Sequence, residues 1–215
     1  MKISAAIYNG KSEIKNIIFD WGGVITELHP QYTLEAFQSL GIPVDNESGL
    51  YNQVFTPFEL GMISPDEFRN RIRKYTSKVL ADSMIDNAWN LILGELPSER
   101  WNLLEVIHMH YRTYLLSNTN LIHQQYYYNY LEKKYGTYGY AHLFEKVYFS
   151  FQLHLRKPDR QIFDFVIRDT GINPHETLFI DDSKENIDTA NHLGFSTVHL
   201  KKPLTLTDLF ENNSD

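Results

Sequence analysis

The stretch IIFDWGGVIT, residues 17–26, decides the fold of this chain and raises the question of its chemistry. A short apolar run leads into one aspartate, Asp20, which is followed by Trp21, two glycines and a second apolar run. An aspartate at the end of a buried strand, facing a glycine turn, indicates a nucleophile or a metal ligand. Two residues later, where a second carboxylate could assist proton transfer, the chain has Gly22.

Five short apolar segments are predicted to be strands that are covered on both faces. They are rich in β-branched and aromatic residues and almost continuously apolar, as buried parallel strands are. The segments are residues 15–20, 113–117, 146–150, 177–181 and 196–200. Helical patterns over 159–171 and 183–194 end in glycines, and a further helix with Ser98 as its expected N-cap precedes the second strand. This alternation predicts an α/β fold, a Rossmann-like parallel sheet flanked by helices.

Residues 30–96 are predicted to form a small helical insert over the C-terminal edge of the sheet, where ligands bind in open parallel sheets. The first two strands are too far apart for one crossover helix. A capping box begins at Ser64, and apolar residues follow at helical spacing from Phe68 to Val79. The expected division is a core domain of residues 1–29 and 97–215, with a cap domain of residues 30–96.

Composition excludes several classes of protein. Hydrophobic residues make up 42% of the 215, enough for a substantial core, and the formal net charge of -7 argues against a nucleic-acid partner. The absence of cysteine excludes disulfides and thiolate metal sites. Because there is neither an apolar run of membrane-spanning length nor a signal sequence, we expect a cytoplasmic protein with no membrane partner. The oligomeric state is not predicted.

Polar residues gather where the predicted strands end. The strand ends carry Asp20, Ser117 with Asn118, and Asp181 with Asp182, and Lys157 follows the third strand. Taken singly these are ordinary, since an aspartate at a strand end more often caps a turn than attacks a substrate. The Asp181–Asp182 pair is different, because adjacent carboxylates at a buried strand end repel each other and normally need a compensating cation.

In this order the stretches FDWGGVI, LLSNTN, RKPD and FIDDSKENI resemble the motifs of the haloacid dehalogenase (HAD) superfamily, from about residue 15 to residue 200. The insert resembles the helical cap found at the same place in that superfamily. With glycine at position 22 the sequence resembles the bacterial α-D-glucose-1-phosphate phosphatase type, which also carries glycine there. Most phosphatases of the superfamily carry a second aspartate at this position. The resemblance implies a HAD-like core with a helical cap.

The resemblance also implies a Mg²⁺-dependent phosphatase acting on a small phosphorylated metabolite. Asp20 matches the nucleophile, Ser117 with Asn118 the phosphoryl-binding residues, and Lys157 the lysine that neutralises charge on the nucleophile and the phosphoryl group. The implied magnesium ligands are Asp20, the backbone carbonyl of Gly22, Asp182, and Asp181 directly or through water. An oxygen-rich site of this kind suits magnesium.

Gly22 leaves three hypotheses open. A phosphatase that lacks a side-chain acid at this position is favoured. Its rate of hydrolysis would fall least for a substrate with a weakly basic leaving oxygen, such as a sugar 1-phosphate. A catalytically silent protein that binds a phosphorylated ligand is the alternative from another class, and a 2-haloacid dehalogenase is less favoured because the acidic pair is intact. In the insert Phe55, Phe58, Glu59 and Met62 could reach the site or equally belong to the insert's core.

Overall fold

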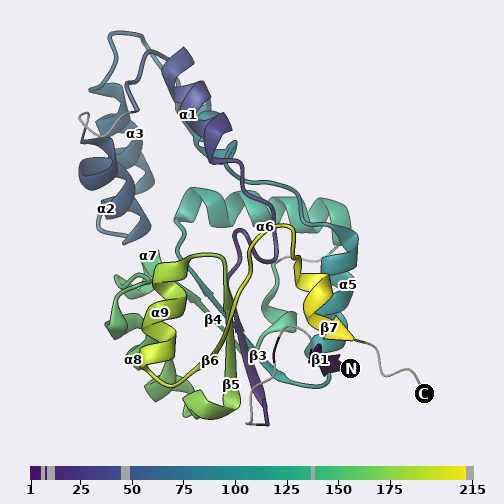
Figure 1. The fold of residues 1–215 in the computed structure, drawn as a ribbon. Coiled ribbons are helices and arrows are strands. Elements are labelled where there is room, and N and C mark those ends of the chain that lie inside the picture. Colours follow the sequence, from purple (N-terminus) through teal and green to yellow (C-terminus); the bar gives the residue numbers. More distant parts are fainter. Residues whose placement is uncertain (6–7, 9–12, 45–48, 137–138, 212–215) are drawn as a thin grey trace.

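A computed structural model describes residues 1–5, 8, 13–44, 49–136 and 139–211. Its centre is a parallel five-stranded sheet in the order β4-β3-β2-β5-β6 (Figure 1). The strands are β2 (Asn16–Phe19), β3 (Arg112–Ser117), β4 (Lys146–Phe149), β5 (Thr177–Asp181) and β6 (Ser196–His199). All five strands predicted from sequence are confirmed to within one residue at each end. A separate antiparallel pair joins β1 (Lys2–Ile3) to β7 (Phe210–Glu211).

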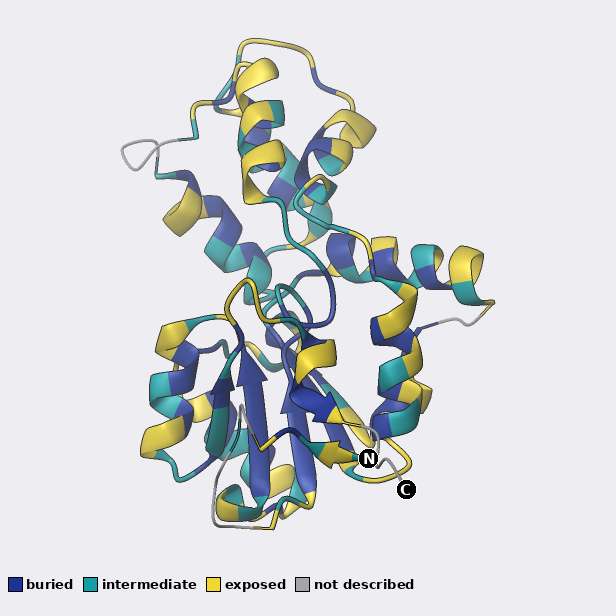
Figure 2. Ribbon diagram, turned by 45° about the vertical axis from the view of Figure 1, so that its right-hand side comes forward, coloured by how far each residue is buried: buried dark blue, intermediate teal, exposed yellow. Residues whose placement is uncertain are grey.

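Helices cover both faces of the sheet, so its strands are buried throughout the centre of the core (Figure 2). Ile17 and Phe19 of β2 pack in one apolar cluster with residues of α5 (Ser98–Ile107) and α6 (Leu121–Tyr135). Ile18 points to the other face, toward residues of α8 (Arg160–Thr170) and α9 (Lys184–His192). The short helix α7 (Ser150–Leu153) follows β4. Alternating side chains of one strand therefore feed two clusters, which confirms the layered α/β architecture.

The segment between β2 and α5 forms a helical cap with an apolar core of its own. It contains α1 (Pro30–Ser39), a π-helical turn (Tyr51–Phe55), α2 (Thr56–Glu59), α3 (Pro65–Arg73) and α4 (Asp82–Asn90). Figure 1 shows it standing beyond one end of the sheet. Phe55 and Phe58 are buried in this second core. We propose on this basis that the domains divide near residues 29–30 and 96–97.

Two chain segments that run side by side connect the cap to the core. The backbone of His29 donates to the carbonyl of Ile92 at 2.8 Å, and that of Gly94 donates to the carbonyl of Glu27 at 2.9 Å. A Cβ atom on Gly94 would lie 2.6 Å from the carbonyl oxygen of Glu27, so only glycine allows this approach. The pairing makes the connection between cap and core a short two-stranded ribbon.

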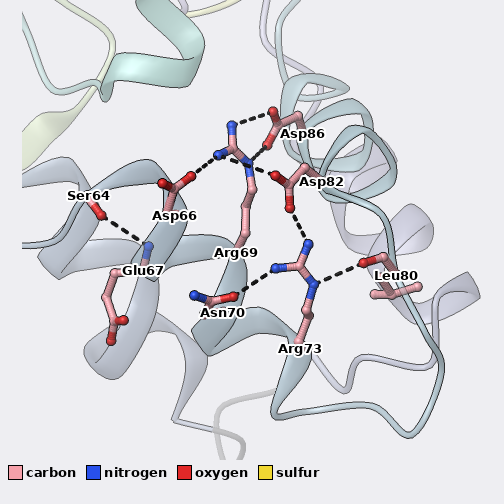
Figure 3. Close-up of polar contacts among 9 residues, drawn as sticks. All are labelled: Ser64, Asp66, Glu67, Arg69, Asn70, Arg73, Leu80, Asp82 and Asp86. Carbon is pink, nitrogen blue, oxygen red and sulfur yellow. Dashed lines mark hydrogen bonds and ion pairs between the residues drawn. The ribbon is translucent and has the colours of Figure 1, made fainter.

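A network of charged side chains ties α3 to α4 in the cap (Figure 3). Arg69 donates from Nε and Nη2 to the two carboxylate oxygens of Asp86, at 2.9 and 2.8 Å. Arg73 binds Asp82 and also donates to the carbonyl of Leu80 at 3.0 Å. The network therefore holds together the two ends of the loop between α3 and α4.

Two sequence predictions at helix ends are wrong, and one is confirmed. Ser64 caps α3 as predicted, its Oγ accepting from the backbone of Glu67 at 3.2 Å (Figure 3). The helix ends at Arg73, so Val79 lies in the following loop and is 99% exposed. Ser98 is the first residue of α5, not its cap, because Pro97 occupies the capping position and no side chain caps the helix. None of the helices in the described part of the chain combines the length and the apolar character that a transmembrane span requires.

Candidate active site

The site begins with Asp20, which directly follows the central strand β2. Its backbone donates to the carbonyl of Ile180 in β5 at 3.0 Å, so the extended pairing continues to this residue. Its Oδ1 accepts from the backbone of Trp21 at 2.7 Å. The glycine turn then leads away: Gly23 donates to the carbonyl of Thr26 at 2.9 Å. Asp20 is thus held at the carboxyl end of the sheet by its backbone contact with β5 and by the contact of its side chain with the backbone of Trp21.

Lys157 lies between two of the carboxylates that sequence analysis selected. Its Nζ is 2.9 Å from Oδ1 of Asp20 and 2.7 Å from Oδ2 of Asp181. Its side chain is only 1% exposed. Burial lowers the pKa of Lys157, but the charges of Asp181 and Asp20 outweigh that effect and leave the pKa raised. The lysine therefore stays positively charged in the buried site.

Asp181, the last residue of β5, has both carboxylate oxygens occupied. Its Oδ2 accepts from Lys157, and its Oδ1 accepts from the backbone of Ser183 and from Nδ2 of Asn186, each at 2.9 Å. Asn186 is a buried polar residue in the first turn of α9. This role of Asn186 is not predicted from the sequence, although the residue lies within FIDDSKENI, because a buried asparagine on a helix gives no separate signal.

Three carboxylates converge at this point. One oxygen each from Asp20, Asp181 and Asp182 lies within 4.8 Å of the others. Burial raises the pKa of Asp20 to about 7; Lys157 opposes this effect, and the negative charge of Asp181 adds to it. Burial, and then Asp181, raises the pKa of Asp182 as well. Because one ammonium group cannot balance three carboxylates, the cluster favours binding of an additional cation.

The glycine turn leaves room for this arrangement. A Cβ atom on Gly23 would lie 2.1 Å from Oδ2 of Asp182, and its φ of +75° favours glycine in any case. No hydrogen bond from the described residues reaches the carbonyl oxygen of Gly22. The candidate cation ligands are thus all oxygen atoms, from the three carboxylates and from the carbonyl of Gly22. Such a set fits Mg²⁺ and other hard cations.

Asn118 lies beside the lysine rather than pointing a free amide into the site. Its Nδ2 donates to the carbonyl of Lys157 at 2.8 Å, and its Oδ1 accepts from the backbone of Lys157 at 2.9 Å. Both polar groups of the amide are thus used to position the lysine. Ser117 is the buried last residue of β3, the strand next to β2, which Asp20 follows.

Two cavities lie next to these residues. One, of about 770 Å³, borders Gly23 and Asp182 and is also lined by Glu27, Arg100 and Lys202. The other, of about 190 Å³, lies where the cap meets the core and includes Arg156, the residue before Lys157. The larger cavity therefore borders the carboxylate cluster at Asp182, whereas the smaller one borders the loop that carries Lys157.

Several known proteins match most of this chain. The model of the haloacid dehalogenase-like hydrolases matches residues 14–194. D-ribitol-5-phosphate phosphatase of Bacteroides thetaiotaomicron is 34% identical over 189 residues, which cover 86% of this chain and 90% of that protein. A sesquiterpene phosphatase of Aspergillus oryzae is 27% identical over 196 residues, 88% of this chain and 91% of that protein.

Solved structures of similar proteins agree with these sequence matches. A HAD family enzyme of Bacteroides thetaiotaomicron, in complex with magnesium and inorganic phosphate, has a TM-score of 0.82 and 38% identity, covering 92% of this chain and all of that one. A 2-haloacid dehalogenase of Pseudomonas syringae shares the fold alone, with a TM-score of 0.56 and 16% identity over 86% of this chain and 85% of that one. The chain therefore belongs to the haloacid dehalogenase-like hydrolase family.

Proposed function

We propose that this hydrolase is a Mg²⁺-dependent phosphatase that cleaves a small phosphorylated sugar or polyol through an aspartyl-phosphate on Asp20. The observation that carries the proposal is the buried Lys157, in contact with both Asp20 and Asp181 beside a third carboxylate. Phosphoryl transfer depends mainly on positioning and on neutralising negative charge, and this arrangement provides both. The names of two relatives support a phosphatase, and the name of the ribitol-5-phosphate phosphatase supports a phosphorylated polyol as substrate.

The covalent step uses Asp20. One of its carboxylate oxygens bonds to phosphorus, the bond from phosphorus to the leaving oxygen breaks, and that oxygen takes a proton from water. A water molecule then cleaves the aspartyl-phosphate, which releases phosphate and restores the carboxylate. Lys157 offsets the negative charge of the nucleophile and of the phosphoryl oxygens. Ser117 donates to a phosphoryl oxygen, and Asn118 holds the lysine in place.

The proposed magnesium ligands are Asp20, the carbonyl oxygen of Gly22, and Asp182. When bound, the cation neutralises negative charge on the phosphoryl group. Asp181 has three donors on its two oxygens, which favours a contact through water over direct binding. Asp182 is accessible and lies against Gly23, which favours direct binding.

Gly22 limits which leaving groups depart easily. Without a side-chain acid there, turnover loses a contribution that is typically ~10²–10⁴-fold. A sugar 1-phosphate, with its less basic anomeric oxygen, tolerates this loss best. The name of the ribitol-5-phosphate phosphatase favours a phosphorylated polyol instead, whose leaving oxygen is an ordinary alcohol. The proposal therefore includes both sugars and polyols.

A panel of phosphate esters tests the proposal. Ribitol 5-phosphate, glucose 1-phosphate and glucose 6-phosphate are assayed with Mg²⁺ and with EDTA. We expect turnover that needs Mg²⁺ and that falls roughly 10³-fold or more in Asp20→Asn. Asp188→Asn is the matched control, since Asp188 is a half-exposed carboxylate paired with Lys184 on α9.

Equal turnover in EDTA, or full activity in Asp20→Asn, would contradict the proposal. Binding of magnesium and phosphate with no turnover of any ester would favour the silent phospho-ligand binding protein. Release of halide from 2-haloacids without magnesium would favour the dehalogenase. The expected cytoplasmic location remains a prediction, which cell fractionation can test.

A further inference from the structure

The smaller cavity, of about 190 Å³, lies where the cap faces the active-site loop. Thr33, Phe55, Thr56, Glu59 and Trp89 line it from the cap, and Arg156 lines it from the core. Arg156 directly precedes Lys157, whose Nζ contacts Asp20. One wall of the cavity is therefore part of the same loop as the catalytic lysine.

Arg156 has more hydrogen-bond donors than the protein satisfies. Its Nη2 lies 3.4 Å from Oε2 of Glu59, and its Nη1 lies 3.4 Å from Oγ1 of Thr56, both near the outer limit for such contacts. Its Nε is buried, and no described residue accepts a hydrogen bond from it. A buried donor without a partner is unfavourable, so this geometry favours a ligand or water that accepts from it.

Glu59 is held opposite this guanidinium by the backbone around it. Its carbonyl accepts from Oγ of Ser150 at 2.6 Å, and the carbonyl of Leu60 contacts Nδ1 of His154 at 2.7 Å. A Cβ atom on Gly61 would lie 2.0 Å from the carbonyl oxygen of Phe151, so this part of the cap rests directly on α7. The side chains of Glu59 and Arg156 remain 26% and 31% exposed, so a ligand can reach both.

The chemistry of the cavity suits a neutral ligand with several hydroxyl groups. Glu59 offsets the charge of Arg156, so the pair does not form a second anion site, whereas together they offer acceptors and donors. The rings of Phe55 and Trp89 pack at a tilt of 36°, with their centroids 4.7 Å apart, and the buried Nε1 of Trp89 has no partner among the described residues. Hydroxyl groups both donate and accept, and carbon-bound hydrogens can pack on the aromatic rings.

Size also favours a small leaving group. About 190 Å³ corresponds to roughly six water molecules at ~30 Å³ each. We propose that Glu59 and Arg156 determine specificity by hydrogen bonding to the hydroxyl groups of the leaving group of a phosphorylated polyol or sugar. This inference rests on the proposed phosphatase function and adds the residues that select its substrate.

The test compares two esters in the Mg²⁺-loaded full-length protein. Ribitol 5-phosphate carries hydroxyl groups, and p-nitrophenyl phosphate carries none on its leaving group. In Glu59→Gln and in Arg156→Met, we expect kcat/KM for ribitol 5-phosphate to fall about 10–100-fold more than for p-nitrophenyl phosphate. The loss should be mainly in KM, since these contacts form in the bound substrate as well as in the transition state.

Glu67→Gln and Arg71→Met are the matched controls. Glu67 and Arg71 form another carboxylate–guanidinium pair in the cap, at 2.8 Å, and do not line this cavity. The inference is wrong if both esters lose activity equally in the Glu59 and Arg156 variants, or if neither does. Turnover of p-nitrophenyl phosphate also reports folding in every variant. Failure of the phosphatase proposal itself would be seen separately, as wild-type protein that turns over neither ester.

Discussion

Two clusters of charged residues in this molecule look alike but have different consequences. In the cap, Arg69 and Arg73 pair with Asp66, Asp82 and Asp86 (Figure 3). The side chains of Asp66 and Asp82 are well exposed to solvent. In the core, Lys157 pairs with Asp20 and Asp181, and those three side chains are almost completely buried. Asp182 adds a further negative charge nearby.

The difference lies in what compensates the charges. Water screens the cap cluster, and bidentate geometry satisfies the Arg69 guanidinium, so the cluster needs no further partner. The buried cluster lacks that screening and holds an excess of carboxylates, which raises the pKa of Asp20 and of Asp182. A balanced, solvated cluster supports the fold, whereas an unbalanced, buried one is suited to binding a cation.

The largest effect is expected from removing the buried ammonium group. Lys157→Met leaves Asp20 and Asp181 without their cation, so we expect unfolding free energy to fall by about 3–5 kcal/mol. We also expect ester turnover to fall ~10²–10³-fold, because charge on the phosphoryl group is no longer offset. Chemical denaturation in EDTA and a steady-state assay in Mg²⁺ measure the two effects.

Lys184→Met is the control for this variant. Lys184 is an exposed lysine paired with Asp188 at 2.7 Å, and its loss should change stability by less than about 1 kcal/mol. If the two lysine variants lost similar stability, the contrast between buried and solvated clusters would be broken.

The next effect is a dependence of stability on pH in the absence of metal. The pKa of Asp20 is raised to about 7 in the folded protein, whereas an aspartate in an unfolded chain titrates near ~3.9. The folded protein therefore holds a proton that the unfolded chain has released. This stabilisation is complete below about pH 4 and is lost as pH rises through about 7, by at most about 1.4 kcal/mol per pH unit.

Asp20→Asn removes this titration and gives the measurement. In EDTA, the stability of the variant relative to wild type should increase as pH rises from about 5 to about 7. Saturating Mg²⁺ should reduce the difference, because the cation favours the ionised carboxylate. Parallel stability curves for the two proteins across that range would show that the buried charge carries no such cost.

A third prediction concerns the glycine that allows Asp182 its position. In Gly23→Ala the new Cβ would meet Oδ2 of Asp182 at 2.1 Å, so that carboxylate must move. We expect the apparent affinity for Mg²⁺ to fall about 10–100-fold, as it does when supporting contacts of a metal site are lost. Titration of activity with Mg²⁺ measures this.

Gly171→Ala separates this clash from backbone strain. Gly171 has a similar φ of +68°, but no atom lies within 4 Å of the place that a Cβ atom would take, so this variant should lose stability without losing affinity for Mg²⁺. Equal Mg²⁺ affinity in the two alanine variants would mean that Asp182 does not need its contact with Gly23.

The sequence predicted the parts of the fold and site that depend on local pattern. Apolar runs predicted the five strands, and parallel strands end at one edge, so Asp20, Lys157 and Asp181 could be expected to meet. The contacts of Asn118 and Asn186 could not be predicted, because they depend on loop conformation. The resemblance implied that Asn118 binds the phosphoryl group, and it implied no role for Asn186. Loop conformation is set by contacts that no periodic pattern reports.

The cap was harder to predict for the same reason. Helical spacing suggested that Val79 was buried, but the chain leaves the helix after Arg73, which binds the carbonyl of Leu80 and Asp82. The sequence alone did not distinguish Glu59 from Phe55, since either residue could face the active site or belong to the core of the cap. Packing buries Phe55 and brings Glu59 opposite Arg156, a distinction made only by tertiary contacts.

The smallest effect is expected in the cap cluster, and it tests the other half of the comparison. Arg69→Met removes the bidentate contact with Asp86, whose carboxylate keeps partial access to water, so we expect a loss of about 1–2 kcal/mol. Because water screens this cluster, the difference from wild type should shrink at high salt. Turnover per folded molecule should stay within about twofold, since Arg69 contacts none of the residues around Asp20. A large fall in turnover at unchanged stability would instead mean that the charge network of the cap is coupled to the active site, and that the two clusters do not act separately.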